Sequence, residues 1–256
     1  MEKACIEVRV DREVAYVTIH NERKLNSLNS ALMEEFKTAI EGLAGDETLR
    51  AVVLTGAGER AFIGGADVNE MAVLDAVSGR AFITRLHQCC EAVRAAPFPV
   101  IARIMGYTLG AGLELAAACD LRLAADTAVF GMPEVKLGIP SVIEAALLPA
   151  LIGWGRARRM LLLGETISAA EAATWGLVEM VVPARDLDRA LENWIASLLQ
   201  TGPQAVRLQK ALIRRWEDLP LSQAIRAGIE TFASAWETDE PKRRMQGFLA
   251  RRPKPS

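Results

Sequence analysis

The sequence predicts an α/β protein, and three features of its residue pattern support this fold class. Short apolar runs typical of buried strands alternate with longer amphipathic segments over the first 135 residues. Such alternation favours a layered α/β domain. From about residue 185 onward the pattern is helical throughout. The chain has 256 residues, 51% of them hydrophobic, which suits one large core with a smaller appendage.

The elements of the first half follow from local patterns. Alternating apolar and polar residues on both sides of residues 11–13 predict a β-hairpin. Leu32, Phe36 and Ile40 recur on one helical face, and Pro97 ends a second amphipathic helix. We expect helices at 30–44, 78–96 and 110–118, strands at 5–10, 14–20, 51–56 and 100–106, and one or two short strands within 121–132.

The second half contains little strand pattern. Ser168 and Glu171 have the spacing of a capping box before a short helix, and residues 176–183 offer one last strand. Helices are expected at 186–200, 203–216, 220–235 and 239–250. The change of pattern suggests two parts, a core over residues 1–195 and a helical region over residues 196–256.

Composition excludes several classes of function. A net charge of −2 offers no electrostatic basis for binding nucleic acid or an anionic membrane, and we interpret Arg243, Arg244, Arg251 and Arg252 as a solvated helix face. No apolar stretch is long enough to span a membrane, and no secretory leader is apparent. The four cysteines lack metal-site spacing and the chain has two histidines, so no metal site is expected. Reduced cysteines indicate a cytoplasmic protein.

Two glycine-containing segments could approach a ligand closely. Residues 61–71 (AFIGGADVNEM) contain Gly64-Gly65, which permits a sharp bend. In residues 106–116 (GYTLGAGLELA), glycines surround the start of a helix, where free backbone N–H groups can hold an oxyanion. The spacing matches neither a dinucleotide-binding fingerprint nor a P-loop.

Glu114 and Glu134 are candidate acid–base residues. Glu114 lies in an apolar helical segment, where a carboxylate is costly unless it is paired, hydrogen-bonded or functional. Glu134 follows Pro133, close to the end of another apolar segment. Each alone has an ordinary structural explanation. In a compact α/β layer the two can meet, and two such carboxylates can divide acid and base roles.

Several segments resemble the enoyl-CoA hydratase/isomerase (crotonase) superfamily, and the chain is most like an enoyl-CoA hydratase. Residues 61–71 resemble its A-F-x-x-G-A-D-[IVL]-x-E-M segment. Residues 104–140 resemble its N-G-x-x-x-G-G-G-x-E-L-A-x-x-C-D … F-x-x-P-E-x-x-x-G segment. Residues 14–36, 167–183 and 237–254 match weaker landmarks, so the resemblance covers nearly the whole chain.

The resemblance implies a fold, an assembly and a reaction. The fold is a spiral of ββα units with C-terminal helices that form trimers or dimers of trimers. Backbone N–H groups of Ala66 and Ala111 would form the oxyanion hole, and Glu114 and Glu134 would hold the water added to a trans-2-enoyl-CoA. No cofactor is implied, since coenzyme A is part of the substrate. The matching CoA-contact positions are Lys24, Leu25, Asn26, Ala61, Gly64, Asp67 and Val68.

The sequence departs from the family pattern at three places. Ala111 replaces the middle glycine, and residues 21–24 read NERK in place of N-R-P-K. Residues 139–151 (IPSVIEAALLPAL) replace a glycine-rich stretch followed by T-Q-R-L-P-R. Within them Glu144 is an extra carboxylate, interpreted as exposed or helix-capping, with a place near the acyl pocket as the alternative. These departures bear on substrate choice, so acyl chain length and branching stay open.

Three alternatives to a hydratase remain. Family isomerases often need only the glutamate at the position of Glu134, so the presence of Glu114 favours hydration. A lyase or dehydratase acting on another acyl-CoA would use much the same groups. A non-catalytic acyl-CoA- or RNA-binding relative would be expected to lose a glutamate or gain a basic surface, and this chain has done neither.

Overall fold

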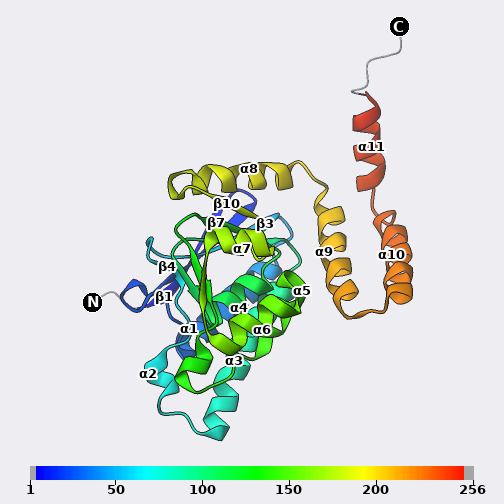
Figure 1. Cartoon of the computed structure of the whole chain (residues 1–256). Helices are drawn as coiled ribbons and strands as arrows, with labels where there is room; N and C mark the ends of the chain where they lie inside the picture. The colour runs from blue at the N-terminus through cyan, green and yellow to red at the C-terminus, as the bar shows by residue number, and fades with distance from the viewer. Residues whose placement is uncertain (1–3, 251–256) are drawn as a thin grey trace.

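The computed structural model describes residues 4–250 (Figure 1). The chain begins with the expected hairpin, formed by β1 (Cys5–Asp11) and β2 (Val14–His20). A short 3₁₀ turn, η1 (Glu22–Lys24), leads to α1 (Ser30–Ala44), which starts where predicted. The side chain of Asn29 caps α1 by accepting a hydrogen bond from the Leu32 amide at 2.9 Å.

The central part of the chain repeats a strand–strand–helix order. The first unit is β3 (Ala51–Gly56), β4 (Ala61–Ile63), α2 (Val68–Met71) and α3 (Ala76–Ala95). The second is β5 (Val100–Ile104), β6 (Tyr107–Leu109) and α4 (Ala111–Ala118), and the third opens with β7 (Leu121–Ala125) and β8 (Val129–Gly131). The turns η2 (Glu134–Leu137) and η3 (Ile143–Leu147) and helices α5 (Leu148–Ile152) and α6 (Trp154–Leu163) complete it.

The two strands of each unit join different sheets. First strands belong to a six-stranded sheet with the order β1-β2-β3-β5-β7-β10, in which only β1 is antiparallel to its neighbour. Second strands belong to a four-stranded sheet with the order β4-β6-β8-β9. The chain therefore advances by one strand in each sheet per unit. This is the expected spiral of ββα units, and the α/β class is confirmed.

The remaining elements close the core. They are β9 (Thr166–Ser168), α7 (Ala169–Trp175), β10 (Met180–Val182), η4 (Ala184–Asp186) and α8 (Leu187–Leu199). The predicted capping box of Ser168 and Glu171 is present at the start of α7. Alternate residues of β3 bury opposite faces of the large sheet: Leu54 joins the main core, whereas Val53 packs in the cluster that contains Leu187 of α8.

The C-terminal helices form an arm beside the core (Figure 1). They are α9 (Pro203–Asp218), α10 (Leu221–Ala235) and α11 (Glu240–Ala250), close to the expected bounds. Buried Lys210 fastens α9 to the core, because its Nζ donates to Asp120 Oδ2 at 2.7 Å and to the carbonyls of Val93 and Phe98. Helix α10 packs on α9.

Several sequence expectations need correction or stay open. The strand expected over 100–106 ends at Ile104, because Gly106 turns with φ of 66° and a separate strand follows at 107–109. Strands β4 and β9 and helix α6 were not expected. A boundary after residue 195 would fall inside α8, and the division into 1–195 and 196–256 stays a prediction.

Two expectations about the surface can be compared with the structure. Arg243 and Arg244 lie exposed on α11, whereas Arg251 and Arg252 fall outside the described residues. None of the helices within residues 4–250 combines the length and apolar character needed to cross a membrane.

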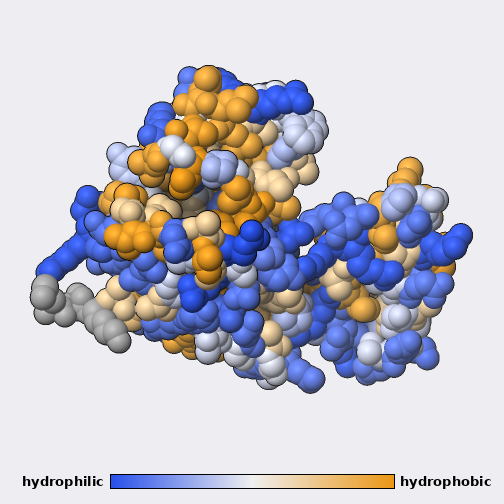
Figure 2. Space-filling model, turned by 90° about the horizontal axis from the view of Figure 1, so that it is seen from below, coloured by the Kyte–Doolittle hydropathy of each residue, from blue (hydrophilic) through white to orange (hydrophobic). Residues whose placement is uncertain are grey.

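Figure 2 shows the molecule from below the view of Figure 1, and hydrophobic side chains gather on this face of the core.

Candidate active site

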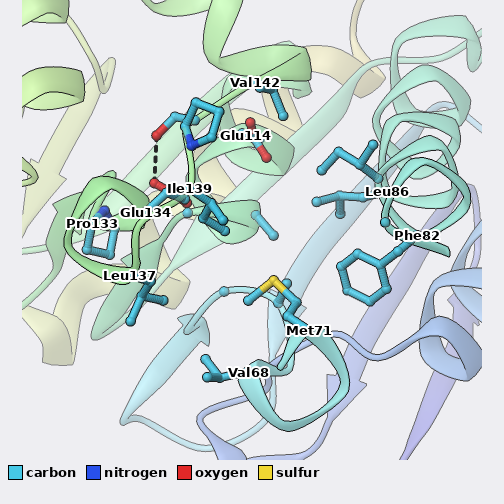
Figure 3. A pocket seen from close by; sticks show the side chains of 18 of the residues that line it. Val68, Met71, Phe82, Leu86, Glu114, Pro133, Glu134, Leu137, Ile139 and Val142 are labelled. Carbon is cyan, nitrogen blue, oxygen red and sulfur yellow. Dashed lines mark hydrogen bonds between the residues drawn. The ribbon is translucent and has the colours of Figure 1, made fainter. Parts of the chain in front are cut away.

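A cavity of about 430 Å³ lies between helices α2–α3 on one side and, on the other, the start of α4, the turn η2 and the segment 139–142 that follows it. Its lining is mainly apolar. Met71, Phe82 and Leu86 form one wall, and Leu137 and Ile139 lie on the other side (Figure 3). A largely apolar, concave site with a few polar groups is typical of a small-molecule pocket.

Glu114 is the buried carboxylate of this cavity. It lies on α4, a helix whose residues are all buried, and only 4% of its surface is exposed. Its Oε1 accepts a hydrogen bond from the Ala145 amide at 3.4 Å. Burial raises the pKa of Glu114 to about 8, the negative charges of Glu134 and Glu144 add to this rise, and the Ala145 amide opposes it.

Glu134 reaches the same cavity from the other side. It is the first residue of η2, and its Oε2 accepts a hydrogen bond from Ser141 Oγ at 2.7 Å (Figure 3). Its Oε1 lies against Gly110, because a Cβ placed on Gly110 would be 2.2 Å from that oxygen. Glu134 is therefore held at the N-terminus of α4, where the helix dipole favours a negative group.

Two backbone amides open onto the cavity beside these carboxylates. The Leu28 amide donates to the Gly65 carbonyl, and the Leu28 carbonyl accepts from the Asp67 amide. The Ala66 amide, which lies between them, takes no part in this pairing. Ala111 is the first residue of α4, so its amide has no partner within the helix. Neither amide has a hydrogen-bond acceptor within residues 4–250. Ala66 and Ala111 line the cavity together with Glu114 and Glu134.

Glycines at the start of α4 permit the close packing of this site. A Cβ on Gly112 would lie 2.0 Å from the carbonyl oxygen of Ile63, so only glycine lets α4 approach β4. Gly64 is similarly close to Leu25, whose carbonyl accepts a hydrogen bond from the Gly64 amide at 2.7 Å. Gly112 therefore permits contact between the two predicted segments, and Gly64 permits contact with the loop at Leu25.

Two of the expected CoA-contact residues line the cavity, and others have structural contacts. Gly64 and Val68 line the cavity. Lys24 Nζ forms an ion pair with Asp67 Oδ2 at 2.6 Å, and Lys24 remains half exposed. The buried Asp67 also caps α2 by accepting from the Asn69 amide, and the Lys24 hydrogen bond is the largest cause that lowers its pKa.

The other three CoA-contact positions line a smaller neighbouring pocket. Leu25, Asn26 and Ala61 are among the residues around this volume of about 220 Å³. The Asn26 side chain is buried and donates to the carbonyls of Ala57 and Ala61 at 2.9 and 2.8 Å. Asn26 therefore holds the loop in place, and its assignment to CoA binding stays a prediction.

Sequence reasoning missed two supports of the site. The interpretation of Glu144 as exposed or helix-capping is wrong, since Glu144 is only 7% exposed, makes no side-chain cap and bonds His87 Nδ1 at 2.8 Å. The negative charge of Glu144 raises the pKa of Glu114, which lines the cavity. Glu144 therefore lies near the cavity, in agreement with the alternative interpretation. The apolar residues around Glu144 were the available signal. No local pattern pointed to Ser141 as the partner of Glu134.

Comparison with known proteins decides the family. The family model described as enoyl-CoA hydratase/isomerase matches residues 9–255. The chain belongs to the enoyl-CoA hydratase/isomerase family. Among its relatives, a short-chain-enoyl-CoA hydratase of Clostridium acetobutylicum is 35% identical over 94% of this chain and 92% of its own length. A crotonyl-CoA hydratase of Syntrophomonas wolfei is 33% identical over 94% of each chain.

Solved structures of this enoyl-CoA hydratase/isomerase family support the same assignment. An enoyl-CoA hydratase from Bacillus anthracis superposes with a TM-score of 0.92 and is 35% identical, covering 96% of both chains. One from Mycobacterium smegmatis gives a TM-score of 0.94 at 30% identity, covering 98% of this chain and 99% of its own. The crotonase-type fold therefore extends over the whole described chain.

Proposed function

We propose that the protein adds water to a trans-2-enoyl-CoA and forms the corresponding 3-hydroxyacyl-CoA. The observation that carries this proposal is the placement of Glu114 and Glu134 in one largely apolar cavity, beside the amides of Ala66 and Ala111. An apolar wall suits an acyl chain, and the paired carboxylates suit a water molecule. Relatives named short-chain-enoyl-CoA hydratase and crotonyl-CoA hydratase support this reaction class.

The reaction would proceed by addition of water across the conjugated double bond. The amides of Ala66 and Ala111 would hold the thioester oxygen, where negative charge develops, and each such donor contributes about 3 to 4 kcal/mol. Glu114 would accept a proton as the water oxygen bonds to the β-carbon. Glu134 would supply the proton to the α-carbon, and exchange with solvent would reset both carboxyls. These are proton transfers, so the proposed reaction needs no metal or redox cofactor.

The test of this function is incubation with crotonyl-CoA and longer enoyl-CoA esters. Hydration removes the conjugated double bond and therefore its ultraviolet absorbance. Loss of that absorbance, with a 3-hydroxyacyl-CoA identified by mass, is the expected result. Unchanged absorbance for every ester would refute the hydratase proposal. Migration of the double bond without addition of water would indicate an isomerase.

Replacing Gly110 with alanine should disturb Glu134 directly. Gly110 has φ of 50°, a conformation costly for alanine, and the new Cβ would meet Glu134 Oε1 at 2.2 Å. We expect kcat for hydration to fall at least about tenfold as Glu134 is displaced. Gly79→Ala is the matched control, because Gly79 also lines the cavity but has open space at its Cβ position. Equal rates in the two variants would contradict this role of Gly110.

We propose that the C-terminal arm joins chains into a homotrimer or a dimer of trimers. Helix α10 presents a row of exposed apolar side chains, and large exposed apolar patches on soluble proteins often mark interfaces. The row comprises Leu221, Ile225, Ile229 and Phe232.

The unpaired cysteines Cys5, Cys89, Cys90 and Cys119 fit a reducing compartment, and we propose the cytoplasm.

Charging this apolar row should disrupt assembly. The double variant Ile225→Asp and Ile229→Asp would place carboxylates in a buried contact, so we expect monomers by light scattering coupled to gel filtration. Glu230→Gln, also on α10, is the control and should keep the wild-type mass. A trimeric double variant would show that assembly uses another surface.

A further inference from the structure

Glu144 is a buried carboxylate that bonds His87 and lies beside the Cys90 thiol. Its Oε1 bonds His87 Nδ1 at 2.8 Å, whereas its buried Oε2 has no hydrogen-bond partner within residues 4–250. The His87 side chain on α3 is 48% exposed, so the pair runs from the surface to the interior. Burying a carboxylate oxygen without a hydrogen-bond partner lowers the stability of the fold, so a functional role for Glu144 should be considered.

The turn that contains Glu144 is in direct contact with Glu114. Turn η3 packs against α4 and α3, and its Ala145 amide donates to Glu114 Oε1. Ile143, at the start of the turn, has φ of 39°, which is strained for a β-branched residue. Such a conformation persists only when surrounding contacts hold it, and the His87–Glu144 bond ties this turn to α3.

We propose that His87 and Glu144 are positioning residues for Glu114: they fix the 143–147 turn so that the Ala145 amide meets the Glu114 carboxyl group. Neither side chain lines the cavity, so both act through Ala145 and through charge. Their effect on turnover depends on the proposed hydration. The geometric claim does not, since it concerns contacts within the protein.

The charge of Glu144 provides a readout that a purely structural role would not change. Within residues 4–250, three titratable groups face Glu114: Glu134 from η2, Glu144 from η3 and Cys90 from α3. Burial and the two carboxylates raise the pKa of Cys90 well above its usual value, so Cys90 stays a neutral thiol. The negative charge of Glu144 raises the pKa of Glu114, and its removal should lower that pKa.

Steady-state kinetics of three variants test the proposal. His87→Ala and Glu144→Ala should each lower kcat at least about fivefold, with KM within about threefold of wild type, because substrate contacts are kept. Glu144→Gln keeps the size and an acceptor for His87. It should recover part of the rate, and the midpoint of its kcat–pH profile should move to lower pH by about half a unit or more.

The second His–Glu pair of the chain supplies matched controls. His20 Nε2 bonds Glu7 Oε2 at 2.8 Å on the β1–β2 hairpin, and neither residue lines the cavity. His20→Ala and Glu7→Gln should leave kcat and its pH profile unchanged. If the His87 and Glu144 variants, folded by circular dichroism, behaved like these controls, the positioning role would be overturned.

A measurement without substrate separates this inference from the proposed function. Infrared difference spectra across the pH range can follow the protonated carboxyl band that is lost in Glu114→Gln. In Glu144→Gln this band should titrate at lower pH than in wild type. An unchanged titration would overturn the proposal even in an active enzyme, and the expected shift would support it even if no enoyl-CoA were hydrated.

Discussion

Replacing either Glu114 or Glu134 with glutamine is expected to lower kcat for crotonyl-CoA hydration about 10²- to 10⁴-fold, the usual contribution of a general acid or base. Glutamine keeps the shape of the side chain but neither accepts nor releases a proton in the relevant range. The apolar wall and the Ala66 and Ala111 amides are untouched, so binding of an unreactive acyl-CoA should change little. Stopped-flow absorbance and calorimetric titration measure the two effects.

Glu192→Gln is a suitable control, since Glu192 is exposed on α8. A near-normal rate in either active-site variant would remove that glutamate from the mechanism. The wild-type pH profile then tests the assignment of roles. With the Glu114 pKa raised to about 8, a base role requires kcat/KM to rise as pH increases through about 8. A fall over that range would make Glu114 the acid.

Glu114→Gln is also expected to stabilise the protein, and increasingly so as pH rises. The pKa of Glu114 is raised from 4.5 to about 8, so between these values the folded protein holds a proton that the unfolded chain has released. The stability contributed by this group is complete below about pH 4.5 and is lost as pH rises through about 8. Glutamine resembles the neutral acid and escapes this loss.

The difference in free energy of unfolding between Glu114→Gln and wild type should therefore grow by about 3 to 5 kcal/mol from acidic to alkaline pH. Urea unfolding at about pH 5 and about pH 9, at one protein concentration, measures it. Glu192→Gln should show the same small offset at both pH values. An offset for Glu114→Gln that does not vary with pH would mean that the carboxyl group is better solvated than its burial indicates.

These two expectations concern the same physical feature. Burial raises the pKa of Glu114 to about 8, so its ionised form, which can accept a proton, is within reach near neutral pH, although ionisation inside the fold is unfavourable. Loss of activity together with a gain in stability in one variant would therefore identify Glu114 as a functional carboxylate. If Glu114 had only a structural role, its replacement would instead lower the stability of the protein.

The sequence by itself determined the elements that local chemistry specifies. The alternation on either side of residues 11–13 gave the hairpin, and Ser168 with Glu171 gave the start of α7. The isolated carboxylate in an apolar helix marked Glu114, and the family motifs pointed to Glu134, Ala66 and Ala111. Each of these signals lies within a short segment, where side-chain type and backbone preference act together.

The tertiary structure alone decided the features that depend on distant partners. Strands β4, β6 and β9 have three residues each, which is too short to show an alternating pattern. They form because β4 pairs with β6, and β6 and β9 each pair with β8, in the second sheet. The burial of Glu144, the Ser141 contact of Glu134 and the Lys210 anchor depend on side-chain directions set by packing. A sequence pattern shows which face of an element is apolar. Which distant groups then meet depends on the free energy of the whole fold.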